Sequence, residues 1–216
     1  MKSLKPLFWI CCLLLLLSVG LAYIKPILKA VQTYTSDDYK GGLDMVEKHF
    51  GSDIDSAAQV YDMNADYLKA LCMLECSGKK AIEPRFEPHV YKQLKKVQLG
   101  ELSNYEHVRP EMLADANDEA LRNLASSWGP FQLMGYKCLL LGIKIRDIRG
   151  PESVLYGVKW IQMTYGECIK NKQFRDAFHI HNTGQRFPQN GKSKTHDPQY
   201  CQKGLRYMKH FESKHQ

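Results

Sequence analysis

The sequence predicts an all-α domain behind an N-terminal transmembrane or signal helix. Residues 7–24 read LFWICCLLLLLSVGLAYI, without a charged side chain. Beyond this run, apolar residues recur mainly at the three- and four-residue spacing of helices, and strand-like alternation is almost absent. Glycine, proline and capping residues divide the pattern into eight or nine short helices with apolar faces.

The uncharged N-terminal run has two interpretations. It is about 18 residues long, which approaches the length needed to cross a bilayer. A cleaved signal peptide usually has a shorter apolar core, although Gly20-Leu21-Ala22 could serve as a cleavage site. The length favours an uncleaved anchor, and the unbroken leucine run argues against a buried core helix. Cys11 and Cys12 lack the small residues that precede a lipidated cysteine.

These features predict the organisation and location of the chain. Residues 1–34 form a signal-anchor or transmembrane segment, residues 35–42 a linker, and residues 43–216 the folded domain. We expect a cell-envelope protein, anchored in the inner membrane with its domain in the periplasm or outside. If the signal is cleaved, the domain is secreted instead.

The chain is basic, with a formal charge of +7 at pH 7. A basic domain suits an anionic polymer such as cell wall, and would equally suit nucleic acid or a lipid surface. No zinc-finger spacing, RNA-binding aromatic motif or long basic run is present. We therefore expect no nucleic-acid partner.

Five cysteines follow the N-terminal run: Cys72, Cys76, Cys138, Cys168 and Cys201. An odd number cannot all pair within one chain. In an oxidising compartment one or two disulfides can form, whereas small buried hydrophobic residues explain the same cysteines equally well. Because the helices carry apolar stripes of their own, we expect folding without an obligatory disulfide.

The helices are placed by their caps and apolar faces. Asn64 can cap the helix that Gly78 ends, and Gly51 and Gly100 can end two others. The expected helices are 43–50, 53–61, 65–76, 88–99, 110–125 with a break near Asn117, 131–141, a long helix from 151, 172–182 and 199–211. Residues 81–85, 101–109 and 186–198 are expected to be irregular.

One glutamate lies on an apolar stripe. In helix 65–76 the stripe consists of Leu68, Leu71, Cys72, Glu75 and Cys76, which share one helical face. A carboxylate in that position either has a partner or stays protonated, because desolvation raises its pKa. A protonated carboxyl is the group that a glycosidase uses to donate a proton. A salt-bridged or partly exposed glutamate at a helix end is the alternative interpretation.

Two motifs around this helix resemble known enzymes. Residues 75–78, ECSG, resemble the Glu-Ser-x-Gly element of lytic transglycosylases and goose-type lysozymes, with Cys76 in place of the serine. Residues 127–135, SWGPFQLMG, closely resemble the Ser-Trp-Gly-x-Phe-Gln-Ile-Met-Gly element of bacterial and phage N-acetylmuramidases. Residues 86–91, FEPHVY, are similar to the Phe-Glu-Arg-His stretch of those muramidases, with Pro88 replacing the arginine.

Two further motifs follow in the order of the same lysozyme-like superfamily. Residues 177–184, AFHIHNTG, resemble the Ala-x-Tyr-Asn-x-Gly segment of the substrate cleft, with His181 replacing the tyrosine. Residues 200–211 resemble the closing helix, which begins with Tyr-x-x-Lys/Arg. The resemblance covers residues 65–211 and implies a lysozyme-like multi-helix domain. The long interval between Glu75 and Gln132 suits the muramidase branch better than typical transglycosylases.

The resemblance implies cleavage of the β-1,4 bond between N-acetylmuramic acid and N-acetylglucosamine in peptidoglycan, with Glu75 as the main catalytic acid. A transglycosylase then uses the sugar's own 6-hydroxyl, whereas a muramidase uses water, more easily with a second carboxylate. Glu87 is the candidate second carboxylate, and Glu83 is the next. The expected substrate-binding residues are Trp128, Gln132, His181, Asn182 and Tyr200.

The implied partners follow from the same resemblance. They are peptidoglycan glycan strands, the inner membrane through the N-terminal helix, and envelope assembly or secretion machinery as a further candidate. No metal and no cofactor is implied. Tyr200 is expected to be a hydrogen-bond partner of Glu75.

Several alternatives stay open. Trp128 and Phe131 could be core aromatics, Gln132 a solvated amide, His181 a core histidine and Asn182 a helix cap. At the level of function, the chain could be a non-catalytic peptidoglycan-binding envelope protein with a degenerate fold. A cysteine–histidine hydrolase is disfavoured, since the cysteine pair of helix 65–76 lacks the usual surroundings of a catalytic thiol.

Overall fold

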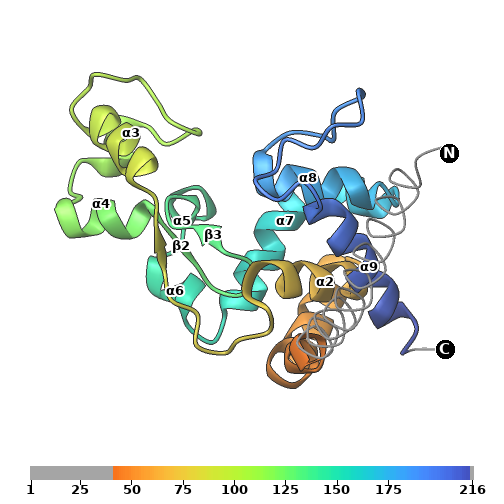
Figure 1. The fold of residues 1–216 in the computed structure, drawn as a ribbon. Helices are drawn as coiled ribbons and strands as arrows, with labels where there is room; N and C mark the ends of the chain where they lie inside the picture. Colours follow the sequence, from red (N-terminus) through yellow and green to blue (C-terminus); the bar gives the residue numbers. More distant parts are fainter. Residues whose placement is uncertain (1–40, 215–216) are drawn as a thin grey trace, which may run out of the picture. The chain divides into compact units, whose positions relative to one another are not determined.

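The computed structural model describes residues 41–214, and these are mostly helical, in agreement with the predicted class (Figure 1). The predicted anchor at 1–34 and most of the linker at 35–42 lie outside the described residues. Among the helices of residues 41–214, none combines the length and apolar character that a membrane crossing requires.

Helices make up most of the described chain, with three short strands between them. Residues 41–61 are helical. The strands are β1 (Arg85–Phe86), β2 (Ser126–Trp128) and β3 (Leu133–Met134), and a 3₁₀ helix, η1, spans Pro110–Leu113. The further helices are α2 (Ala65–Cys76), α3 (Pro88–Gln98), α4 (Asp118–Leu124), α5 (Lys137–Leu141), α6 (Ile145–Arg149), α7 (Ser153–Lys170), α8 (Phe174–Thr183) and α9 (Tyr200–Glu212).

The helices with clear local signals are confirmed. α2 has the predicted bounds, because the Asn64 side chain accepts a hydrogen bond from the Tyr67 amide at 2.7 Å. It ends through Ser77, whose backbone is left-handed, one residue before the glycine expected to stop it. The break near Asn117 is also confirmed, since Asn117 caps α4 through the Ala120 amide at 2.8 Å. α3, α7, α8 and α9 lie within about two residues of the prediction.

Two predicted helix boundaries near glycines are wrong. Gly51 does not separate two helices, because residues 41–61 are helical throughout. No helix runs from 131 to 141. The backbone is left-handed at Gly129, with φ of 71°, and at Gln132, with φ of 47°, and neither conformation continues an α-helix. The chain instead turns from β2 into β3, and a short helix, α5, follows.

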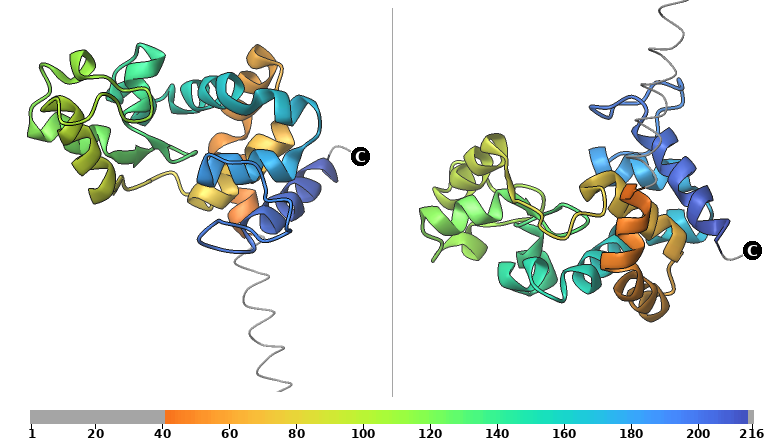
Figure 2. Two further views of the ribbon diagram at one scale, coloured as in Figure 1. Left: turned by 90° about the horizontal axis from the view of Figure 1, so that it is seen from above. Right: turned by 60° about the horizontal axis from the view of Figure 1, so that its bottom comes forward.

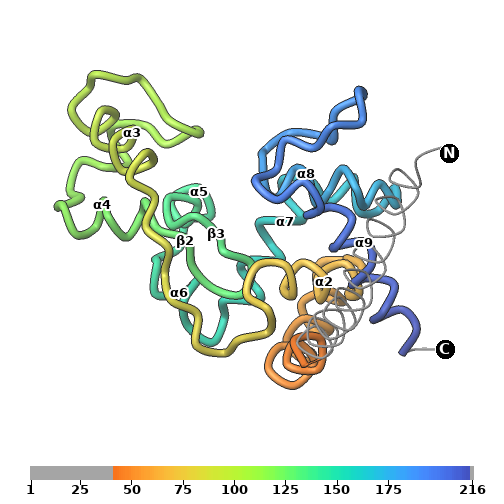
Figure 3. The backbone as a smooth tube through the Cα atoms, in the orientation of Figure 1, coloured from red at the N-terminus to blue at the C-terminus, as the bar shows by residue number. Residues whose placement is uncertain are grey.

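The hairpin belongs to a small antiparallel sheet with strand order β1-β2-β3. Arg85 pairs with Ser127, and Ser127 pairs with Met134. The sheet lies between two groups of helices, one with α3 and α4 and the other with α2, α7, α8 and α9 (Figures 1 and 2). The chain crosses between the groups through an extended segment, residues 79–87, that links α2 to α3 (Figure 3).

Each helix group has its own apolar packing. In the second group α2 and α8 both pack on α9. Gly204 allows the close approach of α8, because a Cβ there would meet ring atoms of Phe178 at 2.9 Å. The first group buries one apolar cluster, formed by Leu94, Val97, Val108, Leu113, Leu121, Leu124, Ala125 and Tyr136.

The cysteines of the described residues are free and buried. Cys72 and Cys76, one turn apart on α2, place their Sγ atoms 3.6 Å apart. These thiols therefore pack as small hydrophobic side chains inside the helical groups.

We predict that reductant leaves the stability of the domain unchanged, because apolar packing and not a disulfide holds the helices together. Thermal unfolding of the full chain with and without reductant measures this. A fall of the midpoint in reductant equivalent to about 2–5 kcal/mol, the usual cost of losing a native disulfide, would contradict the prediction.

Candidate functional site

Glu75 is a largely buried carboxyl in the last turn of α2. Its side chain is 15% exposed. The hydroxyl of Tyr200, the first residue of α9, donates a hydrogen bond to its Oε1 atom. Nε2 of His181, from α8, lies 3.8 Å from the same oxygen. The packing of α2 and α8 on α9 therefore brings together three side chains that are far apart in the sequence.

The surroundings of Glu75 change its acidity. Burial raises the pKa of Glu75 to about 7, while the hydrogen bond from Tyr200 and the positive charges of Arg85 and Lys137 oppose this rise. Burial also raises the pKa of Tyr200 well above its ordinary value, so its hydroxyl stays a donor. Near neutral pH a large fraction of Glu75 therefore carries a proton.

A cavity of about 490 Å³, hereafter the Glu75 cavity, opens at this carboxyl. Its lining residues are Leu74, Glu75, Arg85, Glu87, Ser127, Gln132, Met134, Lys137, His181, Asn182, His196, Asp197 and Tyr200. Six of the predicted site residues therefore lie in one cavity. Trp128 does not, because it lines a different cavity. Asn182 lies near the end of α8 with an exposed side chain, so its role in capping or binding stays a prediction.

Gln132 is held in the turn between β2 and β3. Its Oε1 atom accepts a hydrogen bond from Ser127 Oγ at 2.6 Å, and its Nε2 atom donates to the Gly129 carbonyl at 3.2 Å. These contacts fix the amide at the rim of the Glu75 cavity. Its second Nε2 hydrogen remains a donor that could reach a ligand.

His181 has a structural role and does not act as an acid. Its Nε2 atom is 3.1 Å from the Phe131 carbonyl, and its Nδ1 atom is 2.6 Å from the Tyr165 hydroxyl. Burial, together with the charge of Lys137, lowers the pKa of His181 to about 3, although the Phe131 carbonyl opposes this change. The neutral ring therefore donates through Nε2 and accepts through Nδ1. It ties α8 to the turn that carries Gln132. Phe131 itself is a core aromatic, 1% exposed.

Two further carboxylates line the Glu75 cavity. Glu87, just before α3, forms an ion pair with Arg85, whose Nε atom lies 2.8 Å from Glu87 Oε1. The side chain of Glu87 is 33% exposed. Asp197 is 2.6 Å from Lys203 Nζ, and the hydrogen bond from that lysine lowers the pKa of Asp197. Glu83 does not line this cavity and lies instead in a second cavity, described below.

Sequence reasoning missed several lining residues, chiefly Arg85, Lys137, His196 and Asp197. Arg85 lies in a segment expected to be irregular, and only its strand pairing with Ser127 aims it at the site. Lys137 follows the nine-residue motif and could have been noted for that reason. Burial lowers the pKa of Lys137 to about 8, against the effects of Glu106 and Glu75.

A second cavity, hereafter the adjoining cavity, has a volume of about 380 Å³ and shares Glu75, Arg85 and Gln132 with the first. Its other lining residues are Cys76, Ser77, Lys79, Ala81, Ile82 and Glu83. Glu75 therefore lies where two cavities meet. A chain-like ligand can extend to both sides of its carboxyl.

No family model matches this chain, and no curated protein or solved structure similar to it was found. The residues of the site and the sequence motifs therefore carry the functional proposal.

We predict that the effect of Glu75→Gln on the free energy of unfolding becomes more favourable as the pH rises. The pKa of Glu75 is raised on folding, so its favourable contribution is complete below about pH 4.5 and is lost as pH rises through about 7. Glutamine cannot ionise. The effect of the substitution on the free energy of unfolding should therefore differ by up to about 3 kcal/mol between pH 4 and pH 8.

Urea unfolding at the two pH values measures this difference, with the exposed Glu119→Gln on α4 as the matched control. An equal effect of Glu75→Gln at both pH values would mean that Glu75 is not a buried acid.

Proposed function

We propose that this chain cleaves peptidoglycan glycan strands at the β-1,4 bond between N-acetylmuramic acid and N-acetylglucosamine. The observation that carries the proposal is Glu75, a buried carboxyl with a pKa of about 7 at the junction of two cavities. The resemblance of the motifs around it to the lysozyme-like superfamily supports both the substrate class and a lysozyme-like domain.

Glu75 acts as the general acid. Because Tyr200 donates to Oε1, the proton of the neutral carboxyl sits on Oε2. Oε2 delivers it to the glycosidic oxygen while the bond from that oxygen to the sugar's C1 breaks. The leaving sugar departs as a neutral alcohol and positive charge develops on the remaining ring. General acid catalysis of this kind contributes about 10²–10⁴-fold to the rate.

The resulting Glu75 carboxylate then acts as a base. It takes a proton either from the 6-hydroxyl of the same sugar, which gives a 1,6-anhydro end, or from water, which gives a reducing end. Attack by water is easier when a second carboxylate positions it. Glu87 lines the Glu75 cavity and supports that role. Neither route requires a metal or cofactor.

The cysteine–histidine alternative is not supported. Both ring nitrogens of His181 are engaged, one with Tyr165 and the other with Phe131. His181 therefore has no nitrogen left to activate Cys72 or Cys76. The non-catalytic alternative, a peptidoglycan-binding envelope protein, would retain the cavities but not need a protonated Glu75.

The cellular setting belongs to the same proposal. A substrate in the cell wall requires the domain to be exported, and the uncharged run at residues 7–24 supports an inner-membrane anchor or a secretion signal. Envelope assembly or secretion machinery is the partner that such local wall cleavage would serve.

We predict that Glu75→Gln lowers activity on purified peptidoglycan by about 10²–10⁴-fold, because the amide cannot deliver a proton.

Parent activity should fall as pH rises through about 7, where Glu75 loses its proton. Tyr200→Phe should move that alkaline limb to higher pH, because the Tyr200 hydrogen bond lowers the pKa of Glu75. Release of soluble muropeptides between pH 5 and 9 measures all three effects.

Glu119→Gln, which removes an exposed carboxylate far along the chain on α4, is the control for charge. Full activity of a folded Glu75→Gln protein would falsify the catalytic assignment and leave a binding protein.

We predict that Glu87→Gln separates the two routes. If the parent yields reducing ends, the water route operates and loss of Glu87 should cost at least about tenfold in activity. If the parent yields 1,6-anhydro ends, the substitution should change activity little. Mass spectrometry of the products, combined with rates, measures both. Reducing ends together with an unaffected Glu87→Gln variant would contradict the role of Glu87.

A further inference from the structure

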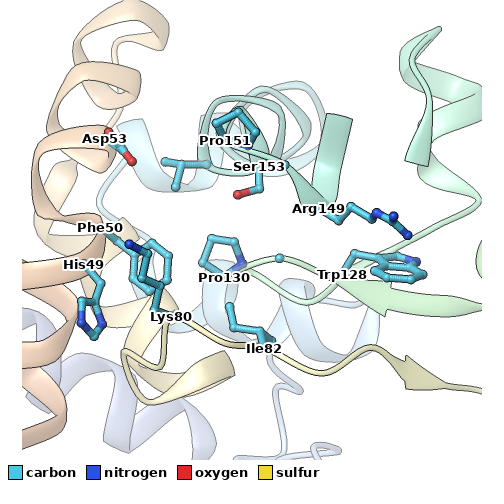
Figure 4. A pocket seen from close by; sticks show the side chains of 13 residues that line it. His49, Phe50, Asp53, Lys80, Ile82, Trp128, Pro130, Arg149, Pro151 and Ser153 are labelled. Carbon is cyan, nitrogen blue, oxygen red and sulfur yellow. The ribbon is translucent and has the colours of Figure 1, made fainter. Parts of the chain in front are cut away.

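A third cavity, hereafter the Trp128 cavity, shares no lining residue with the Glu75 cavity and has a volume of about 470 Å³. Its wall comes from four segments (Figure 4). His49, Phe50 and Asp53 come from helix 41–61, and Lys80 and Ile82 come from the segment after α2. The hairpin contributes Trp128–Pro130, and the start of α7 with the residues before it contributes Arg149, Gly150, Pro151, Ser153 and Val154.

The aromatic wall of this cavity is fixed in place. Trp128 Nε1 donates to the Asn123 carbonyl at 2.9 Å. The Arg149 guanidinium lies 5.7 Å from the centre of its ring. Gly129 holds the turn against α6, since a Cβ there would meet the Ile148 carbonyl at 2.8 Å. An indole held in this way offers a ligand a preformed apolar surface at low entropic cost.

Cationic groups stand at both ends of an apolar floor. Lys80 and Arg149 lie on opposite sides of Pro130 in Figure 4, and buried Phe50 adds to the floor. Within residues 41–214 the ion pairs involve neither Lys80 nor Arg149. Asp53 is the one carboxylate among the residues that line the cavity. This distribution suits a ligand with an apolar body and separated carboxylates.

The Trp128 cavity is linked to the catalytic side of the molecule. The adjoining cavity shares Ile82 with it and shares Glu75, Arg85 and Gln132 with the Glu75 cavity. Lys79, Lys80 and Arg85 follow one another along the segment that borders all three cavities. A ligand attached to a glycan at Glu75 can therefore extend along a basic segment towards Trp128.

We propose that the Trp128 cavity binds the carboxylate-bearing peptide that peptidoglycan carries on its N-acetylmuramic acid. Lys80 and Arg149 pair with the peptide carboxylates, and its aliphatic parts lie on Phe50, Pro130 and Trp128. The identity of the peptide rests on the proposed function, whereas the preference for an anionic peptide rests on the cavity alone. The cavity thus selects peptide-bearing glycan over bare glycan.

The test measures binding without cleavage. The full chain in detergent is titrated calorimetrically with a synthetic stem peptide whose D-glutamate and C-terminal carboxylates are free, and with the same peptide as its amides. We expect the free acid to bind and the amides to bind at least about tenfold more weakly. Lys80→Gln combined with Arg149→Gln should lower the affinity for the free-acid peptide about tenfold, because the double substitution removes two exposed charge pairs.

The matched control combines Lys92→Gln on α3 with Arg146→Gln, which removes the same charge outside the cavity. Equal affinity of the cavity variant and the control variant would overturn the proposal, as would the absence of peptide binding by the parent. Retention on phosphatidylglycerol vesicles that only the cavity variant loses would assign the cavity to a lipid headgroup, and would also overturn it.

A second readout keeps this proposal separate from the catalytic one. On peptide-bearing glycan the cavity variant should show a raised KM with an unchanged kcat, and on glycan freed of peptide it should match the parent. If the parent cleaves no glycan but binds the peptide through Lys80 and Arg149, the catalytic proposal fails and the anionic-peptide site stands.

Discussion

The hydrogen bond from Tyr200 to Glu75 joins the last turn of α2 to the first turn of α9, and the candidate site depends on it. A buried carboxyl without a partner would be costly, whereas a single neutral donor satisfies one oxygen without holding the group fully ionised. The position of Tyr200 depends on packing contacts further along α9. α9 can approach α8 closely because Gly204 leaves room for Phe178. The acidity of Glu75 is in this sense a property of helix packing.

The electrostatics around Glu75 are a balance between opposing effects. Burial favours the neutral acid, and Arg85, Lys137 and the Tyr200 hydroxyl favour the anion. Burial prevails, yet only to a pKa near neutrality, where the group can both give and take a proton. The same low-dielectric surroundings keep His181 neutral, so the residue beside the acid does not compete with it for the proton. It supports the turn of Gln132 instead.

Features with local causes could be predicted from the sequence, and features with distant causes could not. α2 follows from a cap at Asn64 and an apolar stripe, and the same stripe placed Glu75 beside buried residues, where its side chain is 15% exposed. The hairpin at 126–134 was mistaken for a helix start, because its left-handed Gln132 and its pairing with Arg85 depend on tertiary contacts. For the same reason Arg85 and Lys137 were missed as neighbours of Glu75. The assignment of Trp128 to the substrate cleft treated nine consecutive residues as one surface.

β2 explains that last difference. Successive residues of a strand point to opposite faces of the sheet, and here Ser127 lines the Glu75 cavity while Trp128 lines the other. The alternation of side chains along β2 therefore fixes which residue faces the Glu75 cavity and which faces the Trp128 cavity. Loss or gain of one residue in this strand would present the indole where the serine belongs, and would disturb both surfaces at once. A substitution at Ser127 or Trp128 therefore alters one surface, whereas a one-residue insertion or deletion in β2 alters both.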